Sequence, residues 1–154
     1  MKKLNKKLNN QGFTLIELLA VIVILAIVMV ITIPTVLNST NSAKKNAFET
    51  SAQTIADWFE KQYGLAQVND ANLTGGSLDT NFTNLCNNDG LGCTGTTAKT
   101  IDAATMKAAG GDMANYDSAT VLIGSNGRAC VTLTAKSTGK FGTQANPAKS
   151  QACS

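Results

Sequence analysis

A single long apolar stretch stands out in the pattern of hydrophobic and polar residues along the chain. Residues 13–33 are apolar except for Thr14, Glu17 and Thr32. About 20 apolar residues at a rise of 1.5 Å per residue suffice for a helix to cross the ~30 Å hydrocarbon core of a bilayer. The preceding residues 1–12 contain four lysines and no acid, which places the N-terminus on the cytoplasmic side by the positive-inside rule. The pattern therefore predicts a membrane-spanning helix with the bulk of the chain outside.

A second helical pattern follows the apolar stretch. Its apolar side chains recur at spacings of three and four residues, the period of one face of an amphipathic helix; they are Phe48, Ala52, Ile55, Phe59 and Tyr63. Pro34 lies between the two patterns, and a proline within a helix removes a hydrogen bond and bends the axis. We expect a bend at Pro34, either as a kink in one helix or as the end of one helix before the next.

The rest of the chain is rich in Asn, Thr, Ser and Gly and has the character of a small soluble domain. β-branched residues favour strands at residues 119–123 and 129–133, and the Asn-Gly pair between them is typical of a hairpin turn. A third strand is expected at residues 140–142. Together with the long helix, these strands predict an α+β arrangement.

Two further segments of this domain have weaker patterns. Residues 69–91 are rich in turn-forming residues, and residues 101–109 favour a short helix with Thr100 as its cap. The acidic turn at residues 87–89 lacks the alternating ligand pattern of a calcium loop, so we interpret it as a solvated turn.

Glu17 is an acid inside the apolar stretch. An acid at mid-membrane costs about 2.5–3.5 kcal/mol on insertion scales, so we expect a cationic partner. No Lys or Arg lies between Lys7 and Lys44, and no helical neighbour in the same chain supplies the cation. An ordinary secretory signal peptide or a plain signal anchor leaves Glu17 unexplained. If the chain is cut between Gly12 and Phe13, however, the new amine of Phe13 in one subunit can neutralise Glu17 of another.

The residues around this acid resemble a known signature. The string GFTLIEL at residues 12–18 follows a short lysine-rich leader and precedes a long apolar helix, and it resembles the signature of type IV prepilins. The resemblance implies that the prepilin peptidase, a membrane-embedded aspartyl enzyme, removes residues 1–12 and N-methylates Phe13. It assigns Gly12 and Phe13 to the cleavage site, Phe13 and Glu17 to assembly, and Pro34 to a helix kink.

The same resemblance implies the type IV pilin fold. In this α+β fold a long N-terminal α-helix, whose hydrophobic half protrudes, packs on a small antiparallel β-sheet. The expected parts are a cleaved leader at residues 1–12, a hydrophobic half helix for the membrane and the filament core at 13–34, an amphipathic half helix at 35–66, and an extracellular globular domain at 67–154.

Four cysteines lie in the part predicted to be outside the cell. An even number of cysteines in a small exported domain indicates two disulfides, for which three pairings exist. We favour Cys86–Cys93, which closes a short loop, and Cys130–Cys153, which resembles the C-terminal disulfide loop of many pilins. A zinc site made of four cysteines is the alternative, although no two cysteines are separated by the two to four residues that are typical of such sites.

Composition and charge exclude several function classes. The chain has no His, which removes His-based nucleophile pairs, His metal ligands and His acid–base catalysis. We therefore expect no enzyme activity, cofactor or metal. The formal charge of +3 comes from the leader, because 13 basic residues become 9 when its four lysines leave, against 10 acids. We accordingly predict no direct binding to nucleic acid.

These observations predict a structural subunit, the major pilin of a type IV pilus. Its expected partners are further copies of itself in a helical filament, the prepilin peptidase, the pilus assembly machinery and, before assembly, the cytoplasmic membrane. After assembly we expect it in an extracellular pilus on the cell surface. A competence pilin or a type II secretion pseudopilin is the nearest alternative, and a signal-anchored surface enzyme or binding domain is the alternative from another class.

Overall fold

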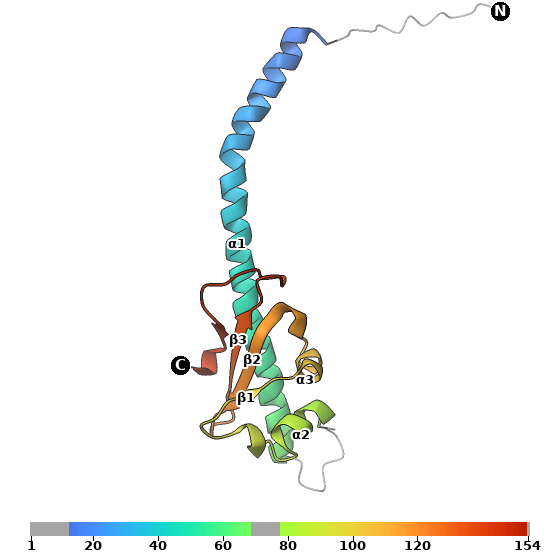
Figure 1. Ribbon diagram of the computed structural model, residues 1–154, viewed down its shortest axis with the longest axis vertical. Coiled ribbons are helices and arrows are strands. Elements are labelled where there is room, and N and C mark those ends of the chain that lie inside the picture. The colour runs from blue at the N-terminus through green and yellow to red at the C-terminus, as the bar shows by residue number, and fades with distance from the viewer. Residues whose placement is uncertain (1–12, 69–77, 154) are drawn as a thin grey trace, which may run out of the picture. The chain divides into compact units, whose positions relative to one another are not determined.

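The computed structural model describes residues 13–68 and 78–153, within two compact units, Met1–Thr40 and Asn41–Ser154. Figure 1 shows the elements along the chain. The α-helices are α1 (Leu15–Val68), α2 (Thr80–Cys86) and α3 (Ala103–Ala108), and the strands are β1 (Lys99–Thr100), β2 (Tyr116–Ile123), β3 (Ala129–Ala135) and β4 (Ala148–Lys149). Short 3-10 helices lie at Leu91–Cys93, Met113–Asn115 and Gln151–Cys153.

Helix α1 contains both helical patterns of the sequence. It continues through Pro34 without interruption, so the helix does not end there, and the bend at Pro34 stays a prediction. In the second unit α1 buries the predicted stripe, since Phe48, Ala52, Ile55 and Phe59 are all buried. Tyr63, the last member of the stripe, is only partly buried against the core.

The sheet has four antiparallel strands in the order β1-β2-β3-β4. Its long pair, β2 and β3, matches the predicted hairpin, and Val121 faces Val131 across it. Alternate residues of both strands point into the core, where the second-unit part of α1 covers this face of the sheet (Figure 1). In the turn Gly127 has a φ of +77°, a value that favours glycine. The α+β fold expected from the sequence is confirmed.

The expected third strand at residues 140–142 is wrong. This segment is a turn, in which the N–H of Gly142 donates to the carbonyl of Gly139 at 3.0 Å. The outer strands of the sheet are instead β1 and β4, each two residues long. Strands this short carry no period-2 pattern, so only their pairing with β2 and β3 defines them.

Two short helices differ from the sequence-based expectations. Residues 80–86 form α2, capped by Asp79, where turns were expected; residues 69–77 lie outside the described part. Helix α3 is capped by Asp102 rather than Thr100, which belongs to β1. The Asp102 carboxylate accepts the N–H of Thr105 at 2.7 Å, and this bond lowers the pKa of Asp102.

Polar side chains of α1 bind backbone groups of the segments packed around it. Glu60 Oε1 accepts the N–H of Ala129 at 3.0 Å and also contacts Arg128 Nε at 3.2 Å. Three glutamines make similar contacts: Gln53 accepts from the N–H of Gln151 at 3.1 Å, Gln62 accepts from that of Asp79 at 3.1 Å, and Gln67 donates to the carbonyl of Asp89 at 3.0 Å. These contacts fix the helix against the start of β3, the C-terminal segment and the loops next to α2.

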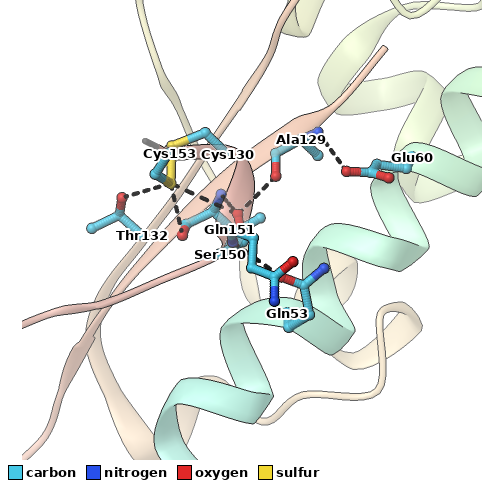
Figure 2. The surroundings of a disulfide bond; sticks show 9 residues. Gln53, Glu60, Ala129, Cys130, Thr132, Ser150, Gln151 and Cys153 are labelled. Atoms are coloured by element: carbon cyan, nitrogen blue, oxygen red, sulfur yellow. Dashed lines mark hydrogen bonds between the residues drawn. A yellow bond between two sulfur atoms is a disulfide. The ribbon is translucent and has the colours of Figure 1, made fainter. Parts of the chain in front are cut away.

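The buried Ser150 completes the outer edge of β3 (Figure 2). Its hydroxyl donates to the carbonyl of Ala129 at 2.8 Å and accepts the N–H of Val131 at 2.9 Å. Its own N–H donates to the carbonyl of Val131 at 2.9 Å. One residue thus satisfies backbone groups that would otherwise form an open strand edge.

Two disulfides lie in the second unit, with the pairing that the sequence favoured. Cys86–Cys93 is buried and joins the end of α2 to the following 3-10 helix. Cys130–Cys153 joins β3 to the C-terminal 3-10 helix beside Ser150 (Figure 2). All four cysteines are therefore in bridges, which leaves no thiolate for the four-cysteine zinc alternative.

We predict that Ser150→Ala destabilises the second unit by about 1–3 kcal/mol, because it removes hydrogen bonds from two backbone groups at a buried position. Denaturant unfolding of the full chain in detergent, followed by the fluorescence of its single tryptophan, Trp58, measures this change. Ser137→Ala is the matched control, since Ser137 is exposed and forms no hydrogen bond within the described residues. Equal unfolding midpoints for the two variants would contradict the role of Ser150.

Candidate functional site

The first unit presents a predominantly apolar surface. Within its described residues, every Leu, Ile, Val and Met of α1 is exposed, on all sides of the helix. The large exposed apolar side chains run from Phe13 to Leu37, slightly beyond the apolar run at residues 13–33. They are Phe13, Leu15, Ile16, Leu18, Leu19, Val21, Ile22, Val23, Ile24, Leu25, Ile27, Val28, Met29, Val30, Ile31, Ile33, Val36 and Leu37. A helix that is hydrophobic on all sides is covered by lipid or by protein in its working state.

Because this apolar surface is large, its transfer from water into lipid or a helix bundle is strongly favourable. Burying one Leu, Ile or Val side chain contributes roughly 1.5–3 kcal/mol, so covering the whole set contributes on the order of tens of kcal/mol. Among the described residues, α1 is the helix whose length and composition suffice to cross a membrane. The arrangement is thus suited to a lipid bilayer or to a bundle of similar helices.

The polar groups within this stretch are satisfied by the helix itself. The hydroxyl of Thr32 donates to the carbonyl of Met29 at 3.4 Å, and that of Thr35 donates to the carbonyl of Ile31 at 3.3 Å. Such bonds to the preceding turn let Thr lie in an apolar environment without an unpaired donor. Pro34 lies between the two threonines and lacks the N–H that would continue the helix pattern.

Glu17 forms a capping box with Thr14 at the start of α1. Glu17 Oε2 accepts both the N–H and the hydroxyl of Thr14, each at 2.8 Å, and the N–H of Glu17 donates to the Thr14 hydroxyl at 3.4 Å. This reciprocal pairing satisfies donors that the first turn of any helix leaves without a partner. The carboxylate also lies at the N-terminal end of the helix dipole, where a negative charge is favourable.

The sequence-based interpretation missed this local pairing. It considered only cationic partners for Glu17, whereas the structure gives the carboxylate two hydrogen-bond donors from its own chain. The signal was readable, since a Thr followed three positions later by a Glu before an apolar run is typical of a capping box. The hydrogen bonds do not neutralise the charge, so the expected pairing with the amine of Phe13 stays a prediction.

Phe13 lies just outside the helix. It is 92% exposed, and the helix begins two residues later at Leu15. Gly12, the other residue of the expected cleavage site, lies outside the described residues. The residue on the carboxyl side of the expected cut is therefore not part of α1.

The described residues of the second unit contain no cluster of metal-binding side chains. Within 41–68 and 78–153, no group of three His, Cys, Asp or Glu side chains is placed to hold a metal ion. The acidic turn at residues 87–89 uses its carboxylate locally, since Asp89 Oδ1 accepts the N–H of Leu91 at 3.0 Å. The apolar stretch and its capped N-terminus are thus the candidate functional site.

Comparison with known proteins identifies the class of this site. The family model of the prokaryotic N-terminal methylation motif matches residues 7–33, which include Gly12, Phe13, Glu17 and most of the apolar stretch. No curated protein and no solved structure gives a significant match to the chain. The chain carries the methylation motif and class III signal peptide typical of type IV pilin-like proteins, and the resemblance drawn from residues 12–18 is confirmed.

The motif indicates how such a chain is processed and assembled. It implies processing by a prepilin peptidase and assembly into type IV pilus-like systems, and it is typical of structural rather than enzymatic proteins. Together with the apolar helix it indicates anchoring in the membrane before assembly. The motif does not distinguish a major pilin from a competence pilin or a secretion pseudopilin.

We predict that Thr14→Val loosens the first turn of α1, because it removes the hydroxyl that binds Glu17. Loss of a side-chain cap costs about 0.5–2 kcal/mol, so the amides of Glu17 and Leu18 should exchange with solvent about two- to thirtyfold faster in detergent micelles. Thr14→Ser should behave as the wild type. Thr40→Val is the control, since it removes a similar bond to the carbonyl of Val36 far from the helix start. Unchanged exchange in Thr14→Val would contradict the capping box.

Proposed function

We propose that the chain is a structural subunit, the major pilin, of a type IV pilus, and that it polymerises through its hydrophobic N-terminal helix after the leader is removed. The observation that carries the proposal is the apolar surface on all sides of α1 within the methylation motif. Lipid covers this surface before assembly. Identical helices packed side by side cover one another after the subunit leaves the membrane.

Leader removal leaves the start of the helix intact. Cleavage between Gly12 and Phe13 makes Phe13 the first residue, and its amine is then methylated. Both donors to the Glu17 carboxylate belong to Thr14, which is not the terminal residue after the cut. The mature subunit therefore keeps the same helix start and the same local bonds to Glu17, with a new positive charge two residues before the helix.

Assembly changes the surroundings of Glu17. In a dry bundle of helices an ionised carboxylate needs an opposite charge, because the loss of hydration is otherwise uncompensated. The amine of Phe13 in a neighbouring copy supplies this charge and fixes the axial offset between the two subunits. Contacts of this kind, in which different surfaces of identical subunits meet without closing a ring, generate a fibre.

A competence pilin or a type II secretion pseudopilin would use the same N-terminal helix. Abundance distinguishes these roles, because a major pilin makes up the bulk of sheared, purified filaments and a minor subunit is a trace component. A surface enzyme or binding domain on a signal anchor would form no filament at all.

We predict that Glu17→Ala reduces filament yield at least tenfold while membrane insertion is unchanged. Removing one partner of a buried ion pair leaves the other charge uncompensated, at a cost of about 3–5 kcal/mol. Filaments sheared from cells and membrane-bound subunit are quantified separately by immunoblotting.

Glu17→Gln separates the two roles of this side chain. The amide oxygen of glutamine still accepts the hydrogen bonds of Thr14, but the residue carries no charge. The proposal expects Glu17→Gln to fail in assembly like Glu17→Ala. Normal filaments from Glu17→Gln would show that the cap alone suffices and would contradict the charge pairing.

A further inference from the structure

The second unit is neutral in total, but its charges are not evenly distributed. Residues 41–154 contain nine Lys and Arg and nine Asp and Glu. Four of the lysines lie around the part of α1 that begins this unit, and we call them the basic ring: Lys44, Lys45, Lys140 and Lys149. The remaining charges of the unit consequently have an acidic surplus.

Three of these four lysines line hollows in the surface of the second unit, and residues of α1 line each of the hollows. Lys140 lines one hollow with Ala47 and Ser51 of α1. Lys149 lines a second with Glu49 and Gln53, and Lys45 lines a third with Phe48, Glu49 and Pro147. Lys44 precedes Lys45 on the same helix. All four lysines are exposed, so their ammonium groups are available to a partner outside the chain.

The positive charge of the ring is largely uncompensated. Among the residues that line these hollows the single acid is Glu49, which belongs to the second and the third. It forms a loose, exposed pair with Lys45 at 3.9 Å. Within residues 13–68 and 78–153 the other three lysines form no ion pair, and Lys140 lies 4.7 Å from the centroid of the Phe141 ring. The four ring lysines and Glu49 together leave a surplus of about three positive charges, although the side-chain charges of the whole unit sum to zero.

Chain connectivity limits the distance between Lys44 and the apolar stretch. Lys44 follows Leu37, the last of the exposed large apolar residues of this stretch, by seven positions. Seven residues span at most about 25 Å even when fully extended. With the apolar stretch in a bilayer, Lys44 thus stays within about 25 Å of the end of that stretch, and an orientation of the second unit that turns this side toward the membrane brings the ring to the headgroups.

We propose that the basic ring binds the headgroup phosphates of anionic phospholipids at the outer surface of the cytoplasmic membrane while the subunit awaits assembly. The inference rests on the membrane-stored state of the proposed function. Lysines at an anionic bilayer surface are attracted by its negative potential, and the attraction is lost within a Debye length of that surface. Extraction of the subunit into a filament then releases these contacts.

The acidic surplus of a second copy is the competing partner, and the structure favours lipid. Four of the acids lie at the starts of helices and turns, where each carboxylate already accepts a backbone N–H; these are Asp79, Asp89, Asp102 and Asp112. Each of these four carboxylates thus already has a hydrogen-bond partner within its own chain. Phospholipid headgroups, in contrast, provide a dense array of phosphates close to the ring.

The test measures the reactivity of individual lysines in the full, uncleaved chain. The protein is inserted into vesicles of phosphatidylcholine alone or of phosphatidylcholine mixed with phosphatidylglycerol, and insertion is verified by resistance to alkaline extraction. A membrane-impermeant amine acylating reagent is added, and mass spectrometry follows each lysine over time. The exposed Lys61, Lys99 and Lys107 serve as internal controls.

We expect the four ring lysines to react at least threefold more slowly in the anionic vesicles than in the neutral ones, with no change at the control lysines. The protection should vanish in 1 M salt, where the Debye length is about 3 Å. Lys140→Gln with Lys149→Gln should weaken the protection of Lys44. The matched pair Lys99→Gln with Lys107→Gln should leave it unchanged.

Three outcomes would overturn the inference. Equal reactivity in the two kinds of vesicle, with insertion intact, contradicts the lipid contact and leaves the proposed function standing. Protection that appears in neutral vesicles and grows with protein density assigns the ring to a second copy. Failure of the chain to insert contradicts the membrane-stored state itself, and with it both proposals.

Discussion

The organisation of this protein depends on one constraint: the first part of α1 has no face that water can solvate well. Apolar side chains surround the helix from Phe13 to Leu37, and even Thr32 and Thr35 direct their hydroxyls to the backbone of their own helix. Such a helix is stable only when lipid or other helices cover it. A chain whose first helix is covered by lipid before assembly and by other helices afterwards would need three features. They are the basic leader, the methylation motif and a second unit that has its own core.

Glu17 connects this constraint to assembly through two kinds of interaction. Its hydrogen bonds with Thr14 are local and complete the first turn of the helix in any environment. Its charge is a different matter, because hydrogen bonds to neutral donors leave a net negative charge in an apolar bundle. The carboxylate can therefore belong to a well-formed helix in the single chain and still require a partner when helices pack together.

Periodicity predicted the parts of the fold that follow from repeated patterns. The stripe containing Phe48 and Ile55 and the β2–β3 hairpin were predictable because each extends over several residues with one buried face. The strands β1 and β4 were not, since two residues show no period and only pairing across the sheet defines them. The bond between Glu60 and Ala129 joins residues 69 positions apart, a distance over which sequence patterns give no signal. At the site, Gly12, Phe13 and Glu17 were recognisable from their motif.

The mass of the mature N-terminus tests the central claim most directly. The protein is isolated from cells that contain a prepilin peptidase, and the intact chain is analysed by mass spectrometry with and without reductant. The account predicts a chain that begins at Phe13 with a methylated amine and gains the mass of four hydrogens on reduction of its two disulfides. A retained Met1, or a cut after Ala43 as in an ordinary secreted protein, would contradict it.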